Sequence, residues 1–229
     1  MKNIYCLLIV SFLCIFSLLP AGAQTLSEKD FQVLNMNDGL SDNDIHSVAK
    51  DTEGFMWFGT GSGLNRYDGR TFKVFRMPGI SYRRIDRVVS LDTDYLLLRS
   101  EQNLFLFDKK YERFLPVCDS VSKQPVMFAD FVADSDGSCW GVSSGELSEV
   151  NFPSSYVQDT AFVSVRHVVN NSQSDPFVVL CMGEDGKMLY CASRNGTVYR
   201  FTPGQRQLTK VCDGQLSSGR WVSSLLNGD

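Results

Sequence analysis

Few residues of this chain combine types and spacing that could do chemistry. There are two histidines, His46 and His167. His46 falls in a segment that we predict to be a strand, and His167 lies in the alternating pattern VSVRHVV, so we interpret both as packed or solvent-facing. The sequence contains neither a Gly-rich phosphate loop nor a Ser-His-Asp order. We therefore predict no catalytic residue and no enzyme activity for this chain.

Acidic residues are frequent enough to raise the question of a calcium site or a catalytic carboxylate pair. The chain has 26 Asp and Glu residues. Most aspartates fall at expected turns, where an Asp side chain hydrogen-bonds to the backbone of its own turn. The turn interpretation is preferred, and we predict no metal and no cofactor.

Five cysteines follow the N-terminal apolar segment: Cys118, Cys139, Cys181, Cys191 and Cys212. The number is odd, and no pair has the two-residue spacing of a zinc or redox site. Buried thiols within strands are the preferred interpretation. One disulfide is the alternative, because Cys181 and Cys191 would face each other if their two segments form a hairpin.

The N-terminus has the pattern of a secretory signal peptide. Lys2 precedes an almost wholly apolar run over residues 4–19, Pro20 ends the run, and Ala-Gly-Ala follows at 21–23. This pattern predicts cleavage before Gln24 and export. The run is short for a membrane span, and no later segment is long enough to cross a membrane. We therefore expect residues 24–229 to be periplasmic.

Composition favours an all-β protein that does not bind nucleic acid. Hydrophobic residues make up 43% of the chain and aromatic residues 12%, which is enough for a real core rich in strand-forming side chains. The net charge is −4, and no basic stripe is available to neutralise phosphates.

One pattern returns along the chain. The motif D-x-x-G-x-x-W begins at Asp51 and again at Asp134. Its turn position recurs every 40 to 49 residues, at Gly54, Asp94, Gly137, Gly186 and Gly228. We predict repeats at about residues 41–76, 84–117, 127–157 and 176–211, and the start of another at 216–229.

Each repeat is predicted to be a small antiparallel sheet. In the first repeat, strands are expected at 45–50, 55–60, 64–67 and 71–75, separated by turns rich in Asp and Gly. One such sheet cannot bury its apolar faces alone, so sheets of this size stack radially as propeller blades. Trp57 and Tyr67 are expected to pack between blades. The predicted fold is a β-propeller of about four four-stranded blades and a partial fifth.

The first repeat resembles a known family. GLSDN at 39–43, DTEGFMWFGT at 51–60 and GLNRYDG at 63–69 resemble the two-component-regulator propeller repeat. They are similar to the start of the N-terminal periplasmic sensor of Bacteroidetes hybrid two-component histidine kinases. Later repeats depart from the pattern: the third has Val150-Asn151 in place of Tyr-Asp, and the fourth lacks both Trp and Tyr-Asp-Gly.

The resemblance implies a receptor larger than this chain. Such proteins carry seven-bladed propellers, an immunoglobulin-like domain, one membrane helix, a histidine kinase, a receiver and a DNA-binding domain. They sense oligosaccharides released from polysaccharides. We expect this chain to be a truncated sensor, with the rest of an inner-membrane receptor and a dimer partner as its partners. The ligand is expected at loops at one end of the propeller axis.

Two other functions stay open, and the ligand-binding residues are unknown. A secreted propeller enzyme of sialidase type is one alternative, although its Asp box has one residue between Asp and Gly where this chain has two. A stand-alone interaction propeller is the other. Four residues are weak candidates for ligand contacts and are equally interpretable as solvated surface: Arg66, Tyr82, Arg83 and Arg84.

Overall fold

The computed structural model describes residues 32–79, 84–133, 138–153, 159–170, 175–183 and 187–214. The chain divides into two compact units, Met1–Leu34 and Asn35–Asp229. The predicted signal peptide at 1–23 and the predicted start of a further repeat at 216–229 lie outside the described residues. In the described ranges, no helix has the length and apolar character that a membrane span needs.

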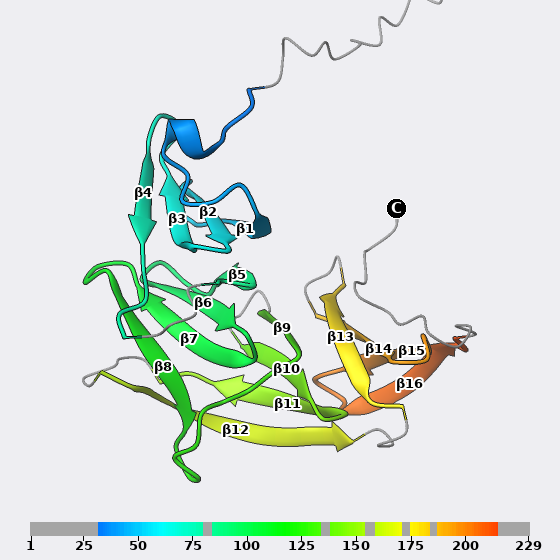
Figure 1. Ribbon diagram of the computed structural model, residues 1–229. Coiled ribbons are helices and arrows are strands. Elements are labelled where there is room, and N and C mark those ends of the chain that lie inside the picture. Colours follow the sequence, from blue (N-terminus) through cyan, green and yellow to red (C-terminus); the bar gives the residue numbers. More distant parts are fainter. Residues whose placement is uncertain are drawn as a thin grey trace, which may run out of the picture. The chain divides into compact units, whose positions relative to one another are not determined.

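In the described residues of the second unit, the regular elements are strands apart from one short 3₁₀ helix, η2 (Met36–Asp38). The first four strands form an antiparallel sheet in sequence order, which we call blade 1 (Figure 1). Its members are β1 (Ile45–Lys50), β2 (Met56–Thr60), β3 (Gly63–Tyr67) and β4 (Phe72–Phe75). The four strands expected from the first repeat are therefore confirmed.

Three more sets of four strands follow, which confirms the predicted blade architecture. Blade 2 consists of β5 (Arg87–Ser90), β6 (Tyr95–Ser100), β7 (Asn103–Asp108) and β8 (Arg113–Asp119). Blade 3 consists of β9 (Asp130–Ala133), β10 (Cys139–Ser143), β11 (Glu146–Asn151) and β12 (Ala161–Asn170). Blade 4 consists of β13 (Phe177–Met182), β14 (Leu189–Ser193), β15 (Val198–Thr202) and β16 (Gln207–Cys212).

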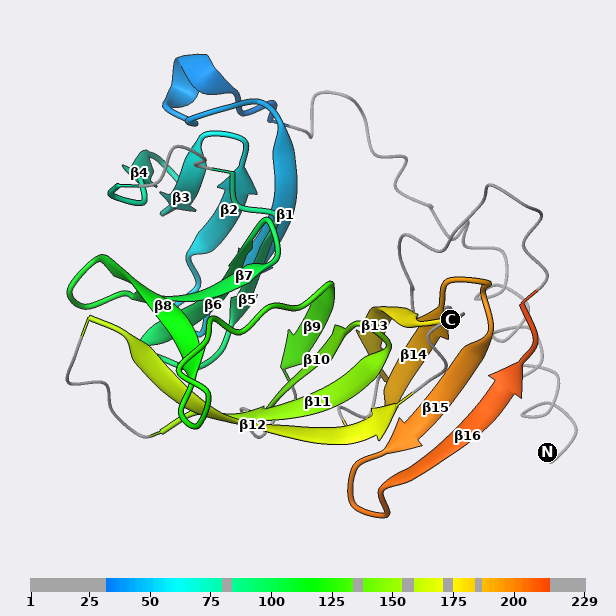
Figure 2. The ribbon, with the colours of Figure 1, turned by 60° about the horizontal axis from the view of Figure 1, so that its bottom comes forward.

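Blades 2 and 3 are joined in a way that the repeat pattern did not predict. The last strand of blade 3, β12, begins at Ala161, beyond the expected repeat boundary at 157. Its first three residues pair in parallel with β8, and the rest of the strand pairs with β11. The two blades thus form one eight-stranded sheet, with β8 and β12 side by side (Figure 2).

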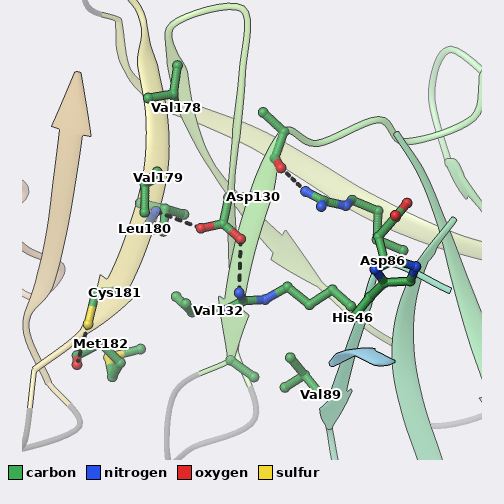
Figure 3. Close-up of a pocket in the computed structure, with 14 residues that line it drawn as sticks. His46, Asp86, Val89, Asp130, Val132, Val178, Val179, Leu180, Cys181 and Met182 are labelled. Atoms are coloured by element: carbon green, nitrogen blue, oxygen red, sulfur yellow. Dashed lines mark hydrogen bonds and ion pairs between the residues drawn. The ribbon is translucent and has the colours of Figure 1, made fainter. Parts of the chain in front are cut away.

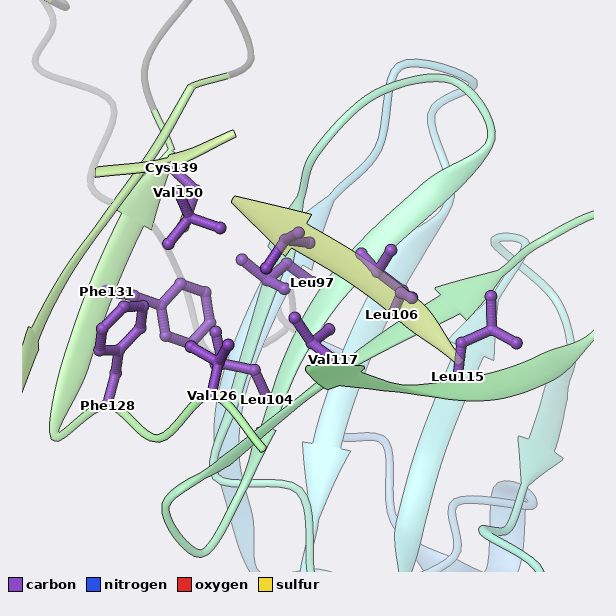
Figure 4. Packing of buried hydrophobic residues seen from close by; sticks show 12 residues of the cluster. Leu97, Leu104, Leu106, Leu115, Val117, Val126, Phe128, Phe131, Cys139 and Val150 are labelled. Carbon is purple, nitrogen blue, oxygen red and sulfur yellow. The ribbon is translucent and has the colours of Figure 1, made fainter. Parts of the chain in front are cut away.

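The core lies at the seams between consecutive blades. One cluster joins blades 1 and 2 and includes Trp57, Phe75 and Phe107. A second joins blades 2 and 3, where Phe128 and Phe131 pack against leucines of β6 and β7 (Figure 4). A third, around Trp140, Leu180 and Phe201, joins blades 3 and 4. Each large side chain buried in this way contributes about 1.5 to 3 kcal/mol.

The two aromatic residues singled out from the first repeat differ in role. Trp57 is 1% exposed, and its ring lies 5.6 Å from that of Phe107 in blade 2, so its predicted position between blades is confirmed. Tyr67 is half-buried and stacks on Phe72 of its own blade at 4.7 Å. Its side chain and that of Trp57 point to opposite faces of blade 1, so Tyr67 takes no part in the packing of blade 1 against blade 2, and its expected role between blades stays a prediction.

The hairpin expected around Cys181 and Cys191 forms, but it carries no disulfide. All five cysteines in the described ranges are thiols. Cys181 is paired with Tyr190, and Cys191 with Leu180. Because successive residues of a strand point to opposite faces, the two cysteines cannot face each other. The five thiols lie within strands, as preferred, but burial is confirmed only for Cys139 and Cys191. The other three are half-buried or exposed: Cys118, Cys181 and Cys212.

Candidate functional site

The first strands of the four blades line a central cavity of about 640 Å³. In the second unit, β1 contacts β5, β5 contacts β9, and β9 contacts β13. His46 comes from β1, Arg87 from β5, Asp130 from β9, and residues 178–182 from β13 (Figure 3). A cavity that touches every described blade is the place where one ligand can contact all of them.

Asp130 connects three blades at the wall of this cavity. Its Oδ2 accepts a hydrogen bond of 2.9 Å from the backbone N–H of Leu180 in blade 4 (Figure 3). Its Oδ1 accepts the N–H of Phe131 at 2.9 Å and lies 3.4 Å from a terminal nitrogen of Arg87 in blade 2. The carboxylate is therefore buried but satisfied, as a buried charge must be.

Arginine side chains from blade 2 form the charged part of the wall. The Arg87 guanidinium lies 5.7 Å from the ring centroid of Phe131. Arg99, from β6, donates to the carbonyl oxygen of Ala129. Burial lowers the pKa of Arg99; the carboxylates of Asp86 and Asp130 act in the opposite direction. The other side of the cavity is apolar, with valines of β9 and β13.

Two of the lining residues sit at β-bulges. His46 is the extra residue where the pairing of β1 with β2 shifts register, and Val178 is the extra residue in β13. A bulge re-aims its side chain, and bulges are common next to functional sites. His46 is 17% exposed, and its Nε2 lies 3.3 Å from Asp44 Oδ2. Of the two expectations for His46, packed or solvent-facing, the packed one is thus confirmed. The His46 side chain also lines the cavity.

The weak candidates from the sequence are not gathered at this cavity. The Arg66 guanidinium stacks over Phe55 at 4.7 Å, away from the lining residues. Arg84 pairs with Asp86, whose side chain is 10% exposed and which does line the cavity. Tyr82 and Arg83 lie outside the described residues.

His167 belongs to a second, smaller pocket of about 280 Å³. Its Nδ1 lies 3.0 Å from Ser148 Oγ and 3.0 Å from Glu146 Oε2. In a catalytic triad, the serine and the carboxylate use different ring nitrogens, so that one end of the imidazole accepts a proton while the other is held. Here both use Nδ1, so this cluster does not have triad geometry.

The aspartates act at turns, as the sequence analysis preferred. Asp68 Oδ1, for example, accepts the N–H groups of Arg70 and Thr71, and these hydrogen bonds lower the pKa of Asp68. The same arrangement, with one Oδ1 accepting two backbone N–H groups, occurs at three further aspartates: Asp51, Asp92 and Asp108. Asp119 accepts the N–H of Ser122 with its Oδ2. Over the residues that the structure describes, no three His, Cys, Asp or Glu side chains are grouped to hold a metal.

Four charged cavity residues were not found from the sequence: Asp86, Arg87, Arg99 and Asp130. Arg99 and Asp130 are charged residues within largely apolar strand segments, YLLLRS and ADFVA. A charge at such a position is costly unless a partner meets it, and that is the signal that could have found them. The partners themselves come from other blades, which the local pattern does not identify.

Comparison with known proteins supports the resemblance seen in the first repeat. Residues 39–62 match the family model of the two component regulator propeller. Histidine kinase P4 of Formosa agariphila is 37% identical to this chain over 78 residues, which are 33% of this chain and 5% of the kinase. The first blade thus carries a two-component regulator propeller repeat, and the chain spans a small part of that relative's length.

Solved structures share the fold at low sequence identity. The extracellular domain of a protein described as a hybrid two component system of B. thetaiotaomicron is 16% identical with a TM-score of 0.58. It is matched over 79% of this chain and 26% of its own. A second such domain, described as a one component system, is 18% identical with a TM-score of 0.56, over 79% and 27%. An inactive virginiamycin B lyase of Staphylococcus aureus is 11% identical with a TM-score of 0.53, over 82% and 60%.

Proposed function

We propose that this chain, whose first blade carries a two-component regulator propeller repeat, is the extracytoplasmic ligand-sensing propeller of a hybrid two-component receptor. The single observation that carries the proposal is the cavity lined by the first strands of all four described blades. The kinase and the other output parts belong to the rest of the receptor, of which this chain corresponds to a small share.

The proposed ligand class is oligosaccharides released by polysaccharide breakdown. Family resemblance suggests the class, and the polar wall of the cavity suits it, because carboxylate and guanidinium groups hydrogen-bond to sugar hydroxyls. Among the described residues that line the cavity there is no Phe, Tyr or Trp. Recognition in this cavity would therefore depend on hydrogen bonds rather than on stacking against aromatic rings.

Signalling would follow from a ligand that touches several blades at once. A ligand shifts a conformational equilibrium only by its difference in affinity for the two states. Asp130 of blade 3 already bonds to Arg87 of blade 2 and to the Leu180 amide of blade 4. The affinity of a ligand that bonds to these groups therefore depends on how the three blades are placed. In the proposed mechanism this changes the placement of two paired receptors in the periplasm and thereby the activity of the kinase.

No observation favours an enzyme over a sensor. The likeness to the lyase is a likeness of fold at 11% identity, and unrelated activities occur on one fold. The cluster at His167 does not have triad geometry.

Titration calorimetry with a panel of neutral and acidic oligosaccharides tests the proposal. Val178→Trp places an indole at the bulge that lines the cavity, and Val211→Trp is the matched control on β16, where Val211 is 55% exposed. We expect a ligand that binds the unmodified chain and the Val211→Trp variant but not the Val178→Trp variant. Equal binding by both variants would place the ligand elsewhere and contradict the proposed site.

A further inference from the structure

Two arginines stand side by side at the cavity wall. Arg87 of β5 and Arg99 of β6 are directly opposite in the antiparallel pair, so their side chains leave the same face of the sheet. Like charges in this position repel each other and destabilise a sheet. Both residues line the cavity. Such a pair is expected where something negative comes to lie against it.

The two carboxylates of the wall pair with Arg84 and Arg87 rather than directly with Arg99. Asp86 pairs with Arg84, and Asp130 pairs with Arg87. Arg99 donates to the neutral carbonyl of Ala129, and no carboxylate of the described residues lies within 4.0 Å of its guanidinium. The wall therefore carries two guanidinium groups and two carboxylates, but Arg99 is the one guanidinium of the wall without a direct carboxylate partner among the described residues.

Burial makes the charge of Arg99 costly. The Nε atoms of both Arg87 and Arg99 are buried and lack a hydrogen-bond partner within the described part of the chain. Burial also lowers the pKa of Arg99, which means that the surroundings disfavour its charged form. A bound anion would restore the missing Coulomb partner, and a guanidinium offers two parallel N–H donors to a carboxylate.

We propose that the central cavity binds a ligand that carries a carboxylate, with Arg99 as its counter-ion. This inference rests on the proposed function, because it concerns the ligand of the same cavity. The opposite wall, with Val132, Val178 and Met182, is apolar and takes the uncharged part of the ligand. The carboxylate can be that of an acidic sugar or of a simple aliphatic acid.

Calorimetric titration of the purified chain at low salt with three probes distinguishes these sources. The probes are D-glucuronate, its uncharged counterpart D-glucose, and butyrate. We expect at least one of the two carboxylates to bind tenfold or more tightly than glucose. Binding of glucuronate alone assigns the carboxylate to an acidic sugar, whereas binding of butyrate equal to or tighter than that of glucuronate assigns it to an aliphatic acid.

Variants connect the binding to Arg99. Because a hydrogen bond to a charged group is worth about twice a neutral one, Arg99→Gln should weaken carboxylate binding about 10- to 100-fold. Arg166→Gln is the control, because Arg166 pairs with Glu149 outside the cavity. This variant should bind the carboxylate as tightly as the unmodified chain does. Arg99→Lys keeps the charge without the paired donors and should give an intermediate loss, which separates ligand recognition from a folding defect.

Three results would overturn the inference. They are equal binding of glucose and glucuronate, unchanged carboxylate binding in both Arg99 variants, and no binding of either carboxylate. In the first two cases the proposed sensor function survives if Val178→Trp still abolishes binding of a ligand from the oligosaccharide panel. The failure of the two proposals can therefore be told apart.

Discussion

The Asp51 carboxylate joins the first turn of blade 1 to blade 2. Its Oδ2 accepts a hydrogen bond of 2.8 Å from Trp57 Nε1 and lies 3.5 Å from Lys109 Nζ. Its Oδ1 accepts the N–H groups of Glu53 and Phe55, each at 3.0 Å. The side chains of Asp51 and Lys109 are 0% and 7% exposed. Replacement of Asp51 by Ala therefore removes the nearest carboxylate of a buried ammonium group and leaves it only the half-exposed Glu53, at 3.9 Å.

The burial of this pair sets the expected magnitude. Removal of one partner from a buried ion pair costs about 3 to 5 kcal/mol, whereas an exposed pair contributes about 1 kcal/mol or less. We therefore expect Asp51→Ala to lower the free energy of unfolding by about 3 to 5 kcal/mol. Asp68→Ala is the matched control, because Asp68 caps an exposed turn of the same blade and its replacement should cost clearly less than that of Asp51.

Urea unfolding at pH 7, followed by tryptophan fluorescence and circular dichroism, measures these values. A double-mutant cycle with Lys109→Met isolates the contribution of the ion pair, for which we expect a coupling energy of about 1 kcal/mol or more. The account of the blade 1–blade 2 contact fails if Asp51→Ala costs no more than Asp68→Ala. It also fails if the coupling energy is zero.

Three further predictions concern protonation, thiol reactivity and packing. Burial alone would raise the pKa of Asp51, but the Trp57 hydrogen bond, the Lys109 charge and the backbone N–H groups together lower it. The Asp51 carboxylate therefore stabilises the fold above about pH 4, and this stabilisation is lost as the pH falls through the lowered pKa. The difference in urea midpoint between the unmodified chain and Asp51→Ala should accordingly shrink on acidification. Burial raises the pKa of Cys191 to about 12, so at pH 8 a thiol reagent should label exposed Cys212 first, and mass spectrometry showing equal labelling would contradict this. A Cβ atom on Gly141 would lie 2.2 Å from the Phe128 ring, so Gly141→Ala should cost about 1 to 3 kcal/mol in urea unfolding, whereas Gly204→Ala, in open space, should cost little.

The sequence predicts blade 1 well because its signals are local. The turn at Asp51 is formed by hydrogen bonds to residues two and four positions further on, so the pattern that encodes it lies within one short segment. Alternation of apolar and polar residues then defines the strands on either side. The same reasoning identified the hairpin around Cys181, but it did not give the register that separates Cys181 from Cys191.

The link between blades and the cavity depend on contacts between distant segments. The pairing of Ala161 with Val117 joins strands whose positions are set by the packing of whole blades, and the repeat pattern carries no sign of it. Asp130 meets the Leu180 amide across 50 positions. Arg87 and Arg99 are close in sequence, but they become neighbours only in the register of the β5–β6 hairpin. The charges were visible in the sequence, whereas their partners were not.

Hydrogen–deuterium exchange with and without a ligand that calorimetry identifies tests the central claim most directly. A sensor whose ligand sits in the central cavity should gain protection in β5, β9 and β13, including the Leu180 amide that bonds to Asp130. The outer strands β4 and β16 should exchange as before. Protection confined to outer strands, with β9 and β13 unchanged, would contradict the account.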